Sequence, residues 1–119
     1  MKKTIVLGAS ASTSRYAYHA VERLIEKGIE VFPIGIREGK IQEVEIIIGK
    51  PELSDIHTVT IYLNPQNQME YYDYIINLKP KRIVFNPGAE NFEFMQIAKK
   101  VGIETQFDCT LVMLSIGSY

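Results

Sequence analysis

The chain has 119 residues, of which 46% are hydrophobic and 23% are charged, and its formal net charge is −1. This length suits one folded unit with its own core, so we expect a single domain over residues 1–119. The balanced charge argues against a nucleic-acid-binding surface, and the absence of an apolar run of spanning length argues against a membrane protein.

The first predicted element is a buried strand that ends at Gly8. The apolar run Ile5–Leu7 precedes a loop of small and hydroxylated residues, and apolar residues recur at helical spacing from about Tyr16. A strand, a small-residue turn and a helix N-terminus form an anion site, because the first-turn N–H groups are free and the helix dipole is positive there. We therefore expect a nucleotide pyrophosphate at Gly8–Arg15. The loop lacks both the three-glycine dinucleotide fingerprint and a P-loop ending, so the alternative is an ordinary βα turn.

The next segments continue the alternation of helix and strand. Gly28 ends the first helix, and a strand follows over 30–34, in which Pro33 predicts a strand end or a sheet edge. A loop over 35–40 leads to a short strand over 44–50. One helical turn is expected at 52–56, and the β-branched residues of 57–63 predict a central strand.

The second half repeats this pattern. A helix is predicted over 66–78, with Met69 on its apolar stripe, and then a strand over 81–85, a helix over 89–101 and a strand over 103–107. The apolar segment 110–116 either completes the core or, if exposed, forms a surface for homo-oligomer assembly. The alternation predicts an α/β fold, namely a doubly wound, mainly parallel five-stranded sheet with helices on both faces.

Ligands of such sheets bind outside the carboxyl ends of the strands. Several distinctive turns fall at that edge, and they are Gly8–Arg15, Gly35–Arg37, Asn64-Pro65 and Asn86-Pro87-Gly88. Asn-Pro and Pro-Gly are common in ordinary turns, so either motif alone indicates little. Their predicted position at the same carboxyl edge of the sheet favours a ligand-binding site there. Arg37 lies where NAD sites use an acidic residue, which favours a phosphorylated ribose, as in NADP or coenzyme A. The alternative is an exposed loop arginine without a role.

Several short motifs resemble a known family. They are Gly8-Ala9-Ser10 with Arg15 and Ala17, Val31-Phe32-Pro33-Ile34, Asn86-Pro87-Gly88-Ala89 and Asp108-Cys109. Their order and spacing resemble small CoA-binding proteins, whose domain also forms the N-terminal part of the succinyl-CoA synthetase α subunit. The resemblance implies a Rossmann-like domain that binds coenzyme A or an acyl-CoA as its small-molecule nucleotide ligand.

The resemblance also implies a set of cofactor-binding residues. The residues implied to hold the pyrophosphate are Gly8, Ala9, Ser10, Ser14 and Arg15. Gly35 and Arg37 are implied near the ADP phosphates. The adenine and pantetheine side is implied to be lined by Leu63, Asn64, Pro65, Asn86, Pro87 and Gly88. The chain departs from the family at Ser12-Thr13, where members often carry proline, and at Gly35-Ile36, where they often carry Asn-Pro.

Catalytic or metal-binding patterns are not evident in the sequence. His19 and His57 are expected to be structural or solvated, and Cys109 has no basic neighbour in sequence that would lower its pKa. The lone cysteine and the lack of a signal-peptide pattern predict a cytoplasmic protein. We expect a non-catalytic binding module, a sensor or a partner of an acyl-CoA enzyme. An NAD(P)-binding redox protein or sensor, for which NADP fits better than NAD, and an interaction domain with a vestigial site remain as alternatives.

Overall fold

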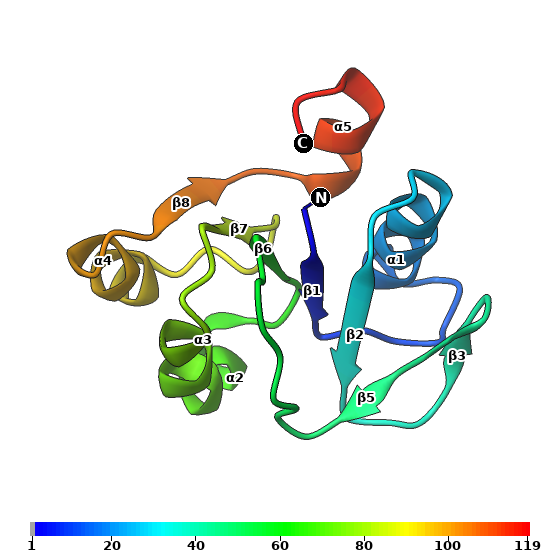
Figure 1. The fold of residues 1–119 in the computed structure, drawn as a ribbon, viewed down its shortest axis with the longest axis horizontal. Helices are drawn as coiled ribbons and strands as arrows, with labels where there is room; N and C mark the ends of the chain where they lie inside the picture. The colour runs from blue at the N-terminus through cyan, green and yellow to red at the C-terminus, as the bar shows by residue number, and fades with distance from the viewer. Residues whose placement is uncertain (1) are drawn as a thin grey trace.

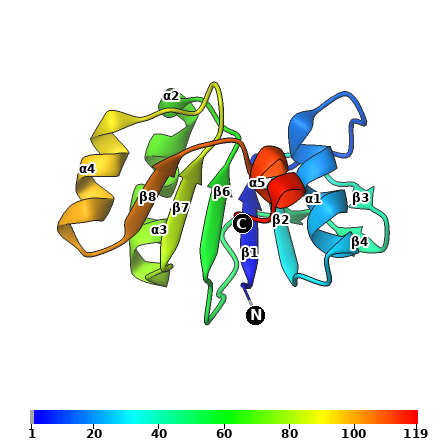
Figure 2. The same ribbon diagram turned by 90° about the horizontal axis from the view of Figure 1, so that it is seen from above.

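The computed structural model describes residues 2–119 and shows a parallel sheet flanked by helices (Figure 1). The strands of this sheet are β1 (Thr4–Leu7), β2 (Val31–Gly35), β5 (Ile47–Ile48), β6 (Thr58–Ile61), β7 (Arg82–Phe85) and β8 (Glu104–Phe107). They lie in the order β5-β2-β1-β6-β7-β8, and every neighbouring pair is parallel (Figure 2). Numbered along the chain, this is the order 3-2-1-4-5-6 of dinucleotide-binding folds, with the switch point between β1 and β6.

The α/β, Rossmann-like architecture is therefore confirmed, but the expected number of strands is wrong. The sheet has six strands and not five, because β5 adds a two-residue strand beyond β2. β5 pairs only with Ile34 and Gly35 of β2. Pro33 thus lies where β2 has a single neighbour, as expected for a residue without a backbone N–H.

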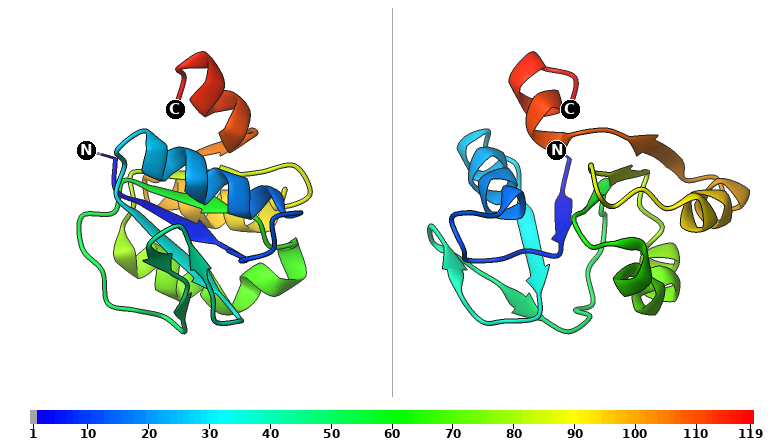
Figure 3. Two further views of the ribbon diagram at one scale, coloured as in Figure 1. Left: turned by 90° about the vertical axis from the view of Figure 1, so that its right-hand side faces the viewer. Right: turned by 180° about the vertical axis from the view of Figure 1, so that it is seen from behind.

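Helices cover both faces of the sheet (Figure 3). The helices of one face are α1 (Tyr16–Glu26) and α5 (Thr110–Ile116), and those of the other are α2 (Pro65–Gln68), the 3₁₀ helix η1 (Met69–Tyr71), α3 (Tyr72–Leu78) and α4 (Phe92–Lys100). Alternate strand residues serve the two faces. Ile5 and Leu7 pack toward α3 and α4, whereas Val6 packs with α1 and α5. Because both faces are covered, strands β1, β6 and β7 are buried along their whole length.

The segment from residue 40 to residue 56 differs from the prediction. Instead of one strand over 44–50, β3 (Lys40–Ile41) and β4 (Val44–Glu45) form an antiparallel hairpin, and only β5 joins the main sheet. Gln42 takes a left-handed backbone conformation (φ 54°), which closes the hairpin turn. The helical turn expected at 52–56 does not form, because Asp55 is also left-handed (φ 59°) and cannot continue a right-handed helix.

The helix predicted over 66–78 is divided into three parts. Asn64 caps α2 by accepting a hydrogen bond from the Asn67 N–H, and Pro65 takes the first helical position. The 3₁₀ turn η1 then shifts the helical phase, so Met69 is 60% exposed and Tyr71 faces the core instead. Similarly, α4 begins at Phe92 and not at 89, because Asn91 is its capping residue.

The apolar tail completes the core. Met113 and Leu114 of α5 are buried in one cluster with Val21 and Leu24 of α1. None of the helices within residues 2–119 has the length and apolar character needed to cross a bilayer.

Candidate functional site

An open cleft of about 1130 Å³ lies outside the carboxyl ends of β1, β2 and β6. Four segments line it: the loop and first turn of α1 over 8–17, the end of β2 over 34–38, residues 62–71 after β6, and Pro87 after β7. The cleft thus spans the switch point of the sheet, where ligands of open α/β sheets bind.

Most of the predicted site residues line this cleft. The lining members are Gly8, Ala9, Ser10, Ser14, Arg15, Gly35, Arg37, Leu63, Asn64 and Pro87. The structure does not place Pro65, Asn86 or Gly88 among the lining residues. Pro65 lies in the first turn of α2, and the Gly88 N–H donates to the Glu90 carboxylate in an exposed turn.

Two glycines let the loop approach the neighbouring strands closely. Gly8 has φ +93°, and a Cβ there would lie 3.1 Å from the side chain of Leu63. A Cβ on Gly35 would lie 2.4 Å from the carbonyl oxygen of Ala9, a backbone atom that cannot rotate away. The N–H groups of Gly8 and Ala9 both donate to the Ile34 carbonyl at 2.9 Å. These two N–H groups therefore fix the shape of the loop and are already used by the protein.

The N-terminus of α1 opens into the cleft without a side-chain cap. Its capping position is Arg15, whose side chain accepts no hydrogen bond, and Tyr16 and Ala17 of the first turn line the cleft. The nearby hydroxyls do not cap the helix either, because Ser12 and Ser14 bond to each other at 2.9 Å. The Tyr18 N–H donates to the Arg15 carbonyl at 3.1 Å, whereas the N–H groups of Tyr16 and Ala17 have no acceptor within the helix and are available to an anion.

Charges of both signs line the cleft. Arg15 and Arg37 are exposed, and neither forms an ion pair within residues 2–119. Glu38 and Glu70 also line the cleft, and the sequence analysis did not assign either a role. The two guanidinium groups stand at the α1 N-terminus and after β2, so they offer two separate positions for phosphate groups.

After β6, Leu63 and Asn64 were predicted to line the cleft, but three further lining residues were not. Asn67, Glu70 and Tyr71 line it, and their spacing of three and four residues is that of one helix face. This spacing was a usable signal, because a helix was already predicted over 66–78. The Lys50 ammonium lies 5.3 Å from the centre of the Tyr71 ring and donates to the Glu70 carbonyl at 2.7 Å.

Tyr62 also lines the cleft and was missed. Its hydroxyl is buried and has no hydrogen-bond partner within residues 2–119. Burial raises the pKa of the Tyr62 phenol well above its usual range, so the group stays neutral at physiological pH.

Beneath the cleft, buried amide side chains join its supporting elements. Asn86 is 1% exposed, donates to Thr60 Oγ1 (2.6 Å) and the Ile61 carbonyl (2.9 Å), and accepts from the Thr110 N–H (2.8 Å). Its polar atoms therefore bind protein groups and connect β6, β7 and α5. Gln68 is likewise buried and donates to the carbonyls of Leu63 and Ala89, both at 2.8 Å.

The residues considered for catalysis lie elsewhere. His57 precedes β6 at the opposite edge of the sheet, and burial, then the charges of Arg82 and Lys2, lower the pKa of its imidazole. Cys109 caps α5 and does not line the cleft. Within residues 2–119, no three potential metal ligands of the His, Cys, Asp or Glu type come together.

Comparisons with known proteins place these observations in a family context. Residues 2–115 match the model of a family described as CoA binding domain. The comparison with curated proteins gave no match. Among solved structures, the crystal structure of an uncharacterized protein is 50% identical and covers 100% of this chain and 98% of its own, with a TM-score of 0.97.

Two more distant structures share the fold. The structure of cell-free ID.343 from Thermus thermophilus is 24% identical, with a TM-score of 0.85, and the match covers 99% of this chain and 91% of that one. A hypothetical protein from Pyrococcus horikoshii OT3 is 23% identical, with a TM-score of 0.86, and the match covers 97% and 82% of the two chains.

Proposed function

The chain belongs to the CoA binding domain family, and from this membership we propose that it binds coenzyme A or an acyl-CoA in the cleft without catalysing a reaction. The observation that carries the proposal is the uncapped N-terminus of α1, which opens into the cleft beside Arg15. A ligand pyrophosphate at this position would accept hydrogen bonds from the N–H groups of Tyr16 and Ala17, which have no acceptor in the described chain.

The pyrophosphate is assigned to the loop over 8–15. The free N–H groups of Tyr16 and Ala17 and the unpaired Arg15 guanidinium supply the donors, and Ser10 and Ser14 add hydroxyls. Gly8 and Ala9 contribute shape, because small residues let the phosphate approach and their own N–H groups already bind Ile34.

The 3′-phosphate of the ligand is assigned to Arg37. This guanidinium is exposed on the loop directly after β2 and has no ion pair within the described chain. Gly35 permits the close contact between this strand end and the pyrophosphate loop. The adenine and pantetheine groups are assigned to the apolar and amide surface of Leu63, Asn64 and Pro87, with Pro65, Asn86 and Gly88 holding the shape of that wall.

The residues that line the cleft favour a ligand-binding role over a catalytic one. Neither histidine nor Cys109 lines it, and its titratable groups are two guanidiniums, two carboxylates and three phenols. Such a module would act as an acyl-CoA sensor or present the ligand to a partner acyl-CoA enzyme.

An NADP-binding protein is the second candidate, because an arginine after β2 also suits a 2′-phosphate. Calorimetric titration with coenzyme A, 3′-dephospho-coenzyme A, NADP and NAD separates the two. We expect coenzyme A to bind most tightly and its dephospho form roughly tenfold more weakly, the equivalent of one charge-assisted contact.

Three arginine variants test the site itself. Arg37→Ala should weaken coenzyme A and leave the dephospho form unchanged, whereas Arg15→Ala should weaken both, each by about tenfold. Arg23→Ala is the matched control, because Arg23 pairs with Glu26 on α1 away from the cleft lining. Binding of NADP alone would reject the coenzyme A assignment, and unchanged affinity in both cleft variants would reject the site.

A further inference from the structure

The exposed loop over 10–14 is attached to α1 by one side chain. The Nε2 atom of His19, in the second turn of α1, lies 2.8 Å from the carbonyl oxygen of Thr13. Within the described chain, the other hydrogen bonds of residues 10–14 join loop residues to one another or to Arg15. The position of this loop relative to the helix therefore depends on the His19–Thr13 hydrogen bond.

This hydrogen bond also orients a neighbouring donor. The peptide between Thr13 and Ser14 is trans, so its C=O and N–H groups point in opposite directions. Because the Thr13 carbonyl faces His19, the Ser14 N–H faces away from His19. Ser14 lines the cleft, whereas Thr13 and His19 do not.

We propose that His19 is a positioning residue for the phosphate-binding loop, which it serves by fixing the Thr13–Ser14 peptide so that the Ser14 N–H donates to the ligand pyrophosphate. This role rests on the proposed function, because it needs a phosphate in the cleft. His19 acts through the peptide and does not itself contact the ligand.

Both ring nitrogens of His19 have partners. A carbonyl oxygen only accepts hydrogen bonds, so Nε2 donates to Thr13. Nδ1 lies 3.3 Å from a carboxylate oxygen of Glu22 on the next turn of α1, so the two contacts together hold the ring in one orientation.

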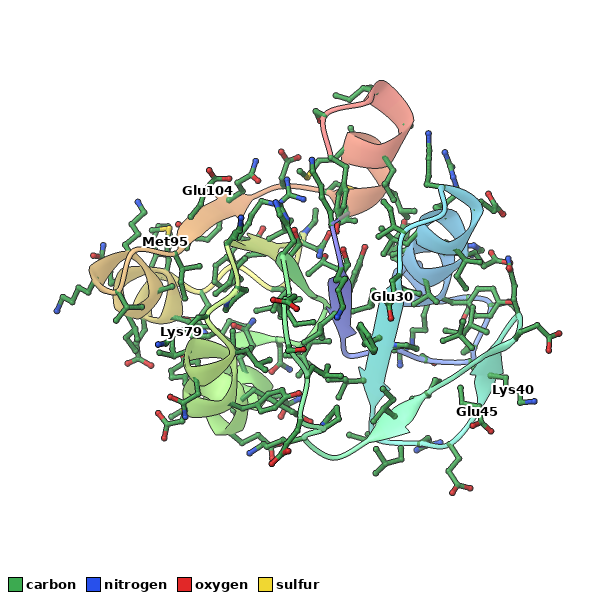
Figure 4. All side chains as sticks on the ribbon, viewed as in Figure 1. Glu30, Lys40, Glu45, Lys79, Met95 and Glu104 are labelled. Carbon is green, nitrogen blue, oxygen red and sulfur yellow. The ribbon has the colours of Figure 1, made fainter. Side chains whose placement is uncertain are left out.

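Few other charges act on this ring. On α1 itself, Arg15 and Arg23 lie one turn to either side, and the Tyr18 ring packs edge-on at 5.5 Å. The elements packed most closely against α1 are β1, β2, β3 and α5. Their one charged residue is Lys40 of β3, which lies opposite Glu45 of β4 (Figure 4). Glu22 is therefore the acidic partner of His19.

The test measures coenzyme A affinity, and each variant is expressed as its ratio to the unaltered protein under the same conditions. His19→Ala should bind about tenfold more weakly, the effect of one lost hydrogen bond to a charged phosphate.

Three further variants separate the loop contact from other effects. His19→Gln keeps a hydrogen-bond donor near the Nε2 position and should restore most of the affinity. Glu22→Gln alters the second partner of the ring and should weaken binding less than His19→Ala does. His57→Gln alters the other histidine, at the opposite edge of the sheet, and should bind like the unaltered protein.

A ligand-free measurement keeps the two proposals apart. The Arg15 N–H donates to the Ser12 carbonyl across this loop, so its hydrogen exchange should be several-fold faster in His19→Ala than in the unaltered protein, with unchanged exchange in β1. Failure of the unaltered protein to bind coenzyme A would overturn the proposed function and the role of His19 with it. Normal binding together with a His19→Ala affinity ratio near one, or unchanged Arg15 exchange, would overturn the role of His19 alone.

Discussion

At the scale of single residues, the cleft depends on positions where a side chain is missing. Gly35 has an ordinary negative φ, so its requirement for glycine comes from space and not from backbone conformation. The missing Cβ makes room for the Ala9 carbonyl, which is part of the proposed phosphate loop. Glycine at position 35 thereby permits the backbone contact that holds the end of β2 against the proposed phosphate loop.

Gly35→Ala should therefore destabilise the fold. A Cβ 2.4 Å from the Ala9 carbonyl forces β2 and the loop apart, and such overpacking costs about 2 kcal/mol of unfolding free energy. Thermal unfolding should show a midpoint about 10 °C lower, as expected for a chain of this size. Gly49→Ala is the control, because a Cβ there meets nothing within 4 Å and adds only the strain of a left-handed residue (φ +96°). Equal losses in the two variants would contradict the contact argument.

At the scale of elements, a small number of buried amides hold the strands and helices around the cleft. Asn86 joins β6, β7 and α5, and Gln68 joins α2 to the backbone carbonyls of Leu63 and Ala89. Asn86 was also predicted to contact the ligand. Its three side-chain hydrogen bonds to protein groups show that it positions the elements that form the cleft.

Asn86→Ala should leave the Thr110 N–H and the Ile61 carbonyl without this partner in a buried environment. The loss of unfolding free energy should be about 3 kcal/mol, because unpaired buried groups keep their full desolvation cost. Chemical denaturation measures it. Asn77→Ala, at an exposed position in α3, should change stability by less than about 0.5 kcal/mol. A loss no larger for Asn86→Ala than for Asn77→Ala would show that the buried bonds contribute little.

The element order was predictable because buried strands and amphipathic helices leave clear periodic patterns. The first strand, the loop to Arg15 and helix α1 were all expected at their observed places. The β3–β4 hairpin was not, since its two-residue strands are too short for a periodic signal. The short 3₁₀ turn η1 was not predicted for the same reason, and its phase shift turns Met69 outward instead of toward the core. Local patterns thus predicted the loop side of the site, while the helix side depended on packing.

At the scale of the whole molecule, His57 gives stability a dependence on pH. Burial, and then the charges of Arg82, Lys2 and Lys81, hold the pKa of His57 below 6.5 in the folded protein. Between the two values the unfolded chain binds more protons than the folded one, so unfolding free energy rises with pH. The contribution is complete above about pH 6.5 and is lost as the pH falls through the lowered folded value.

His57→Gln should therefore reduce the acid sensitivity of the fold. Melting temperatures measured from pH 7.5 to 5 should fall less steeply for this variant than for the unaltered protein. His19→Gln serves as the comparison for general effects of removing a histidine. A slope for His57→Gln equal to that of the unaltered protein would show that His57 does not contribute to the pH dependence.

The first and last described residues lie side by side, which has a practical consequence. The Lys2 ammonium and the Arg82 guanidinium both donate to the Tyr119 carbonyl, and the Tyr119 hydroxyl lies 2.5 Å from Thr4 Oγ1 at the start of β1. This junction is at the opposite edge of the sheet from the cleft. A short linker between residues 119 and 2, with new ends opened at the β3–β4 turn, should give a circularly permuted protein with the same cleft. Surface attachment through residue 2 or residue 119 should likewise leave the cleft facing outward for ligand capture.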